Sequence, residues 1–71
     1  MDFYEDLKKM DALARINVEK VINGWKPGIY LKYDYNSGND GIKIEIRRDG
    51  HAHGVIYKNG VRKFYDWRLN K

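Results

Sequence analysis

The chain has no cysteine, no threonine and a single serine, Ser37. The absence of cysteine excludes disulfide bonds and thiolate metal sites, and it fits a reducing, intracellular compartment. Covalent catalysis commonly uses a serine, threonine or cysteine nucleophile, so the scarcity of these residues argues against that class of enzyme. We therefore expect a protein that is not an enzyme and that uses no cofactor.

The sequence also lacks a long apolar run. Three of its first six residues are acidic, and nothing in the 71 residues approaches the 18 or so consecutive apolar positions of a membrane-spanning helix. A chain of this length builds one small core. We expect residues 1–71 to form a single small domain, cytoplasmic and without a membrane partner.

Basic side chains are in excess only in the second half of the chain. Residues 1–35 contain six acidic and six basic side chains, whereas residues 36–71 contain four acidic and eight basic ones. The formal net charge of +4 therefore arises from the C-terminal half, where it can create a positive potential that attracts polyanions.

Residues 2–23 show helical periodicity. Apolar side chains recur at the spacing of one helix face: Phe3, Leu7, Met10 and Ala14. Asp2 can cap this helix, with Glu5 three residues later as in a capping box. Asn17 can cap a second short helical turn that Asn23-Gly24 would end.

Residues 29–69 show the alternation of β-strands. The clearest strand alternates three isoleucines with polar residues: Ile42, Lys43, Ile44, Glu45, Ile46 and Arg47. Asp49-Gly50 and Asn59-Gly60 supply the positive φ angles of tight hairpin turns. The predicted fold is α+β, with an N-terminal amphipathic helix packed on one face of a four-stranded antiparallel meander. The short second helical turn is an optional addition to this helix.

The lengths of the last two turns decide which side chains of the final strand are buried. Two-residue loops at both turns would place Val61, Tyr65, Trp67 and Leu69 on the open face, away from the helix. Because each large apolar side chain gains about 1.5–3 kcal/mol from burial, we expect one turn to be a three-residue loop with a glycine bulge. The final strand then turns these four side chains into the core.

Either position of the bulge leaves one set of side chains on the open face. This candidate binding set combines cations with aromatic rings: Tyr30, Lys32, Lys43, Arg47, Arg62, Phe64 and Arg68. Cations neutralise phosphates and aromatic rings stack on bases, so the combination suits nucleic acid. The simpler interpretation is a solvated sheet face. The third strand adds either His51, His53, Val55 and Tyr57 or Ala52, Gly54, Ile56 and Lys58 to this face.

His51 and His53 lie two positions apart, about 7 Å along a strand, and Asp66 can approach them across a hairpin. A zinc site usually needs three or four ligands in fixed geometry, so from the sequence we expect no metal. The same residues, with Arg62 or Arg68 to hold a phosphate, are also what a small metal-independent ribonuclease would use. That is the third functional hypothesis.

The leading hypothesis is a small, non-enzymatic nucleic-acid-binding protein that contacts DNA or RNA mainly through backbone and stacking interactions. The alternative is a protein-binding inhibitor or accessory protein of the phage or mobile-element type that engages a host protein. Tyr30, Tyr57 and Phe64, with Arg62 and Arg68, suit that role because Tyr and Arg are common interface anchors. Unpaired edge strands could also pair with those of a second copy, so a homodimer is a further alternative.

Overall fold

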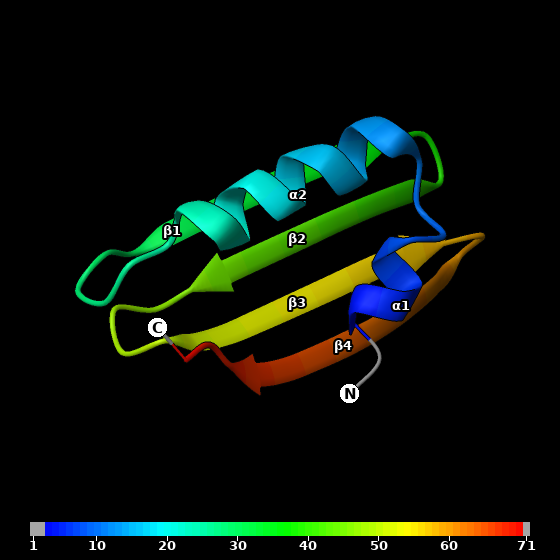
Figure 1. Cartoon of the computed structure of the whole chain (residues 1–71). Helices are drawn as coiled ribbons and strands as arrows, with labels where there is room; N and C mark the ends of the chain where they lie inside the picture. The colour runs from blue at the N-terminus through cyan, green and yellow to red at the C-terminus, as the bar shows by residue number, and fades with distance from the viewer. Residues whose placement is uncertain (1–2, 71) are drawn as a thin grey trace.

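Four antiparallel strands form one sheet in the order β1-β2-β3-β4, and both helices lie on the same face of it (Figure 1). The computed structural model describes residues 3–70. Its elements are α1 (Phe3–Leu7), α2 (Ala12–Gly24), β1 (Leu31–Ser37), β2 (Asp40–Ile46), β3 (His51–Lys58) and β4 (Val61–Arg68). The predicted α+β meander is confirmed. Neither helix within residues 3–70 is long and apolar enough to cross a bilayer.

The helical segment is divided differently from the prediction. A short helix, α1, comes first and ends at Leu7, and the longer α2 begins at Ala12. The break occurs because the side chain of Asp11 accepts a hydrogen bond from the backbone N–H of Leu13 at 2.8 Å and caps a new helix. Asn17, predicted as a cap, lies inside α2. The predicted cap at Asp2 lies outside the described residues.

The glycine bulge lies in the turn between β2 and β3. The backbone N–H of Arg47 donates to the carbonyl of His51 at 2.9 Å, which leaves a three-residue loop that ends at Gly50, with φ at 93°. The turn between β3 and β4 has only two loop residues, Asn59 and Gly60, both with positive φ as a type I′ turn requires. The predicted register is therefore confirmed, and the third strand presents His51, His53, Val55 and Tyr57 on the open face.

The two helices cover different halves of the sheet. In Figure 1, α2 lies along β1 and β2, and α1 lies over β3 and β4. The sheet contributes Ile42, Ile44, Ile46, Ala52, Ile56 and Tyr65 to the core, and α2 contributes Ala14, Val18 and Ile22. On α1 the buried side chains are Phe3 and Leu7. The alternation of the isoleucines thus places a continuous apolar surface under both helices.

Three of the four side chains predicted to be buried on β4 and just after it reach the core. Tyr65 is 8% exposed, and Trp67 and Leu69 are partly buried against the core cluster. Val61 is 66% exposed, so its predicted burial is wrong. Val61 adjoins the Asn59-Gly60 turn, which extends beyond the end of α1 (Figure 1), so no helix covers it.

Candidate functional site on the open face

All seven residues of the candidate binding set lie on the open face, opposite the helices. The register aligns their strands in rows across the sheet, and the side chains on that face are Lys32, Asp34, Asn36, Lys43, Glu45, Arg47, His51, His53, Val55, Tyr57, Arg62, Phe64, Asp66 and Arg68. Tyr30 precedes β1 and reaches the same face through its hydroxyl. Five of these side chains are basic and three acidic, so the positive excess on this face is modest.

An aromatic patch lies at the end of this face next to the Asn59-Gly60 turn. It consists of Val55 and Tyr57 on β3 with Arg62 and Phe64 on β4, which pair directly across the strands. The guanidinium carbon of Arg62 lies 5.3 Å from the ring centroid of Tyr57 and 5.9 Å from that of Phe64. Both distances are within cation–π range. Phe64 is 70% exposed, so the patch offers a large apolar ring to solvent.

A hollow borders the aromatic patch on its β1 side. Tyr57 and Lys43 line it together with Asp34, Asn36 and the loop between β1 and β2. Gly41 lies between Asn36 and Tyr57 in the sheet and has no side chain, so the surface of the sheet is depressed at this position. The hollow and the patch therefore form one continuous surface with rings on one side and polar groups on the other.

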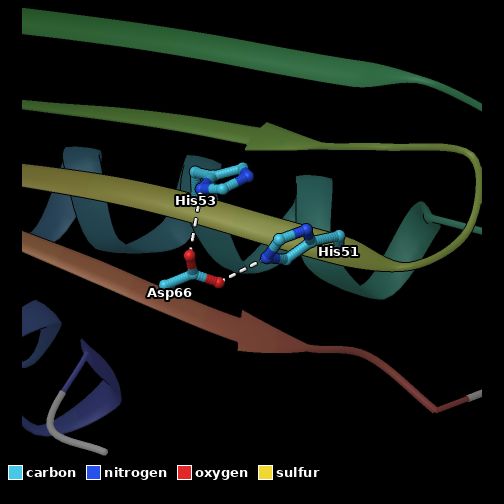
Figure 2. Close-up of side chains that lie close together, drawn as sticks. All are labelled: His51, His53 and Asp66. Atoms are coloured by element: carbon cyan, nitrogen blue, oxygen red, sulfur yellow. Dashed lines mark hydrogen bonds and ion pairs between the residues drawn. The ribbon is translucent and has the colours of Figure 1, made fainter.

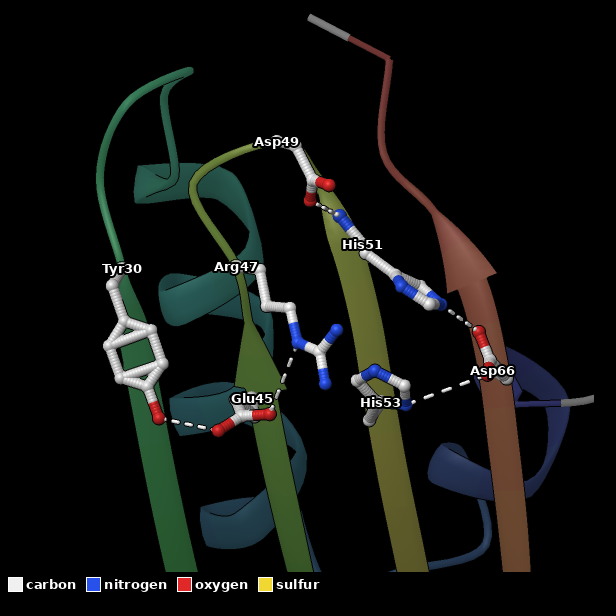
Figure 3. Close-up of polar contacts among 7 residues, drawn as sticks. All are labelled: Tyr30, Glu45, Arg47, Asp49, His51, His53 and Asp66. Atoms are coloured by element: carbon white, nitrogen blue, oxygen red, sulfur yellow. Dashed lines mark hydrogen bonds and ion pairs between the residues drawn. The ribbon is translucent and has the colours of Figure 1, made fainter.

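At the opposite end of the face, Tyr30 and Arg47 both contact Glu45 (Figure 3). The Tyr30 hydroxyl donates to Glu45 Oε2 at 2.5 Å, and Arg47 Nε lies 3.9 Å from Glu45 Oε1. The hydrogen bond from Tyr30 lowers the pKa of Glu45, and it raises the pKa of Tyr30. Two members of the candidate binding set are thus already engaged by a carboxylate.

His51, His53 and Asp66 converge beside this network, as Figure 2 shows. His51 Nε2 donates to Asp66 Oδ1 at 2.5 Å, and His53 Nδ1 lies 3.5 Å from Asp66 Oδ2. The two imidazole rings are 4.3 Å apart between centroids. The hydrogen bond from His51 lowers the pKa of Asp66. The convergence that the sequence left open is present.

The turn before β3 explains this convergence. The side chain of Asp49 accepts the backbone N–H of His51 at 3.0 Å, and Arg68 donates to the Asp49 carbonyl at 3.2 Å. These contacts hold the bulged loop against β4. The backbone hydrogen bond lowers the pKa of the Asp49 carboxyl. Arg68, predicted as a binding residue, therefore also stabilises the loop that orients His51.

Val55 and Tyr57 are functional candidates outside the binding set predicted from the sequence, which names Tyr57 only as an anchor for a protein partner. Their face depended on which turn carried the bulge, and both Asp49-Gly50 and Asn59-Gly60 suit either turn type.

Comparisons with protein-family models, with curated proteins and with solved structures found no match for this chain.

Proposed function

We propose that the protein binds single-stranded nucleic acid on the open face of its sheet, with the aromatic patch as the stacking surface. The observation that carries this proposal is that the guanidinium carbon of Arg62 lies near both aromatic rings of the patch, 5.3 Å from the centroid of Tyr57 and 5.9 Å from that of Phe64. Base stacking on an exposed ring is worth about 1–3 kcal/mol per base and tolerates any sequence. Phe64, the most exposed of these rings, is the main stacking residue.

Lys32 and Lys43 supply the phosphate contacts. Neither forms an ion pair within 4 Å among residues 3–70, and both are exposed. Lys43 lies in the same row as Val55 and Phe64, two strands from Phe64, a distance of about 10 Å from the usual strand spacing. A single strand of nucleic acid with one base stacked on Phe64 can therefore extend across β3 and bring its phosphate backbone to Lys43.

The experiment is an anisotropy titration with labelled single-stranded and double-stranded DNA and RNA oligonucleotides at low salt. Phe64→Ala should weaken binding to single strands by about tenfold, because one stacking contact of roughly 1.4 kcal/mol is lost. The matched control is Tyr4→Ala, which removes another exposed aromatic ring, on the helical side. Binding of no oligonucleotide by the intact protein would refute the proposal.

A protein partner is the second candidate, and the acidic residues on the open face favour it. Asp34, Glu45 and Asp66 repel phosphates, whereas a protein surface can pair with both signs of charge. Tyr, Phe and Arg side chains grouped as in the aromatic patch are typical interface anchors. A pull-down from lysate with and without nuclease separates the two, because only nucleic-acid-dependent capture disappears after nuclease treatment.

A further inference from the structure

We propose that His51, His53 and Asp66 form a binding site for one divalent transition-metal ion of the Zn²⁺ type. The potential donor atoms, one from each residue, all lie within 4.8 Å of one another. In a tetrahedral zinc site with bonds of about 2.0–2.2 Å, the donor atoms lie about 3.3–3.6 Å apart. Small side-chain rotations therefore close the three donors around an ion without moving the strands.

The backbone brings these ligands together before any ion arrives. His51 and His53 are two positions apart on β3, so both rings project from the same face. Asp66 on β4 stands directly opposite His53 and is hydrogen-bonded to His51. Two strands joined by a tight turn thus hold the whole ligand set, which limits the entropy that binding costs.

The present contacts leave His53 incompletely satisfied. Its only contact with Asp66 is 3.5 Å long, and its Nε2 is buried without a hydrogen-bond partner in the described part of the chain. Buried polar atoms normally have a hydrogen-bond partner. A weakly held imidazole beside an ionised carboxylate is free to exchange its contact for a metal bond.

The donor set selects the class of ion. Two imidazole nitrogens and one carboxylate suit Zn²⁺, Co²⁺, Ni²⁺ or Cu²⁺, whereas Ca²⁺ and Mg²⁺ prefer oxygen ligands. The side chains of His51, His53 and Asp66 are 29, 34 and 61% exposed. The ion would therefore keep at least one coordination position open to solvent or to an external ligand.

Two cations near the site work against binding, but both have partners. Arg47 lies near Glu45, and Arg68 donates to the Asp49 carbonyl. Glu45 faces His53 from β2 and adds a negative charge on the other side. The site does not depend on the proposed nucleic-acid function, and it revises the sequence-based expectation that no metal is bound.

The test is a titration of the full chain, first treated with a chelator, with Co²⁺ followed by absorbance and then with Zn²⁺ as competitor. The chain has only two histidines, so any histidine-dependent signal reports this site. We expect one ion per chain, a cobalt spectrum of four or five ligands, and a higher melting temperature with Zn²⁺. Asp66→Asn and His53→Gln should each weaken binding by more than about tenfold.

Asp34→Asn is the matched control, because it removes a carboxylate from the same face but outside the site. Its metal affinity should equal that of the parent. Circular dichroism checks that each variant is folded. If the His53→Gln variant does not fold, the Asp66→Asn variant, which changes an exposed side chain, decides the outcome. The proposal is overturned if the parent binds no Co²⁺ or Zn²⁺ at micromolar concentrations, or if Asp66→Asn binds as tightly as the parent.

Discussion

The indole of Trp67 stacks on the ring of Phe3, with centroids 4.5 Å apart and planes inclined by 26°. Phe3 is fully buried, and it also makes an edge contact with Tyr65 at 5.3 Å. This aromatic cluster joins α1 to β4, so the first and last elements of the chain stabilise each other.

Trp67→Ala should lower the free energy of unfolding by about 3 kcal/mol, the lower end of the range for a buried tryptophan, because the indole is only partly buried. Urea denaturation measures the change. Phe64→Ala on the same strand is the control: its ring points to the open face and is largely exposed, so it should change stability little. Equal losses in both variants would contradict the assignment of the two faces.

Gly54→Ala should destabilise the protein through the same cluster. A Cβ at this position would lie 2.8 Å from Phe3 Cε1, which is closer than packed atoms tolerate, and 3.3 Å from Trp67 Cζ3, which is tight. Overpacking of this kind costs about 1–3 kcal/mol. Replacing Phe3 with Leu in the same chain should recover part of the loss by making room. Gly24→Ala, where a Cβ meets nothing within 4 Å, is the control and should be neutral or stabilising. Thermal unfolding of the four chains tests the prediction.

Acid should weaken the attachment of α1 through Asp6. The hydrogen bond from Tyr65, followed by that from Lys63, lowers the pKa of the Asp6 carboxyl. A carboxyl whose pKa is lower in the folded state contributes stability above its unfolded pKa of about 3.9, and that contribution is lost as the pH falls through the folded value. Asp6→Asn should therefore lower the melting temperature at pH 7. The further fall in melting temperature between about pH 5 and pH 3 should be smaller in this variant than in the parent.

Glu5→Gln is the control for this measurement, since it removes an exposed carboxylate from the same helix. Its melting temperature should follow that of the parent at every pH. If Asp6→Asn also loses stability on acidification as steeply as the parent, the contacts of Asp6 do not contribute to acid sensitivity.

Replacing Lys32 and Lys43 together with Ala should weaken nucleic-acid binding and flatten its salt dependence, because these two exposed side chains supply the phosphate contacts. For a single strand each lost phosphate contact lowers the slope of log K against log salt by about 0.7. The double variant Lys8→Ala, Lys20→Ala removes the same charge from exposed positions of the helical segment and should change the slope much less. Equal effects of the two double variants would show that total charge, and not the open face, controls binding.

The sheet could be predicted from its sequence because three local signals agree: the alternation of Ile42, Ile44 and Ile46, the turn dipeptides, and the recurrence of Tyr65, Trp67 and Leu69 at every second residue. The break between α1 and α2 could not be predicted from the sequence. Phe3, Leu7, Met10 and Ala14 keep a helical spacing across it, and only the packed structure shows that Asp11 caps a new helix. Asp11 also accepts a hydrogen bond from the Tyr35 hydroxyl at 2.6 Å, a contact between residues far apart in the sequence.

The candidate sites depended on one such non-local choice. Asp49-Gly50 and Asn59-Gly60 have similar turn chemistry, so the sequence could not tell which forms the three-residue loop. The choice moves His51, His53 and Tyr57 together from one face to the other. The proposed metal ligand set, and the place of Tyr57 beside Arg62 in the aromatic patch, are both consequences of the bulge at Gly50.

The division of the helical layer has a consequence for how the protein opens. A five-residue helix is not stable in water by itself, so α1 is helical only while Phe3 and Leu7 are docked on β3 and β4. Release of this segment uncovers Trp67 and Tyr65 but leaves α2 packed on β1 and β2. Amide hydrogens of α1 should therefore exchange with solvent through a local opening, well before those of the central strands, which exchange only when the whole domain unfolds.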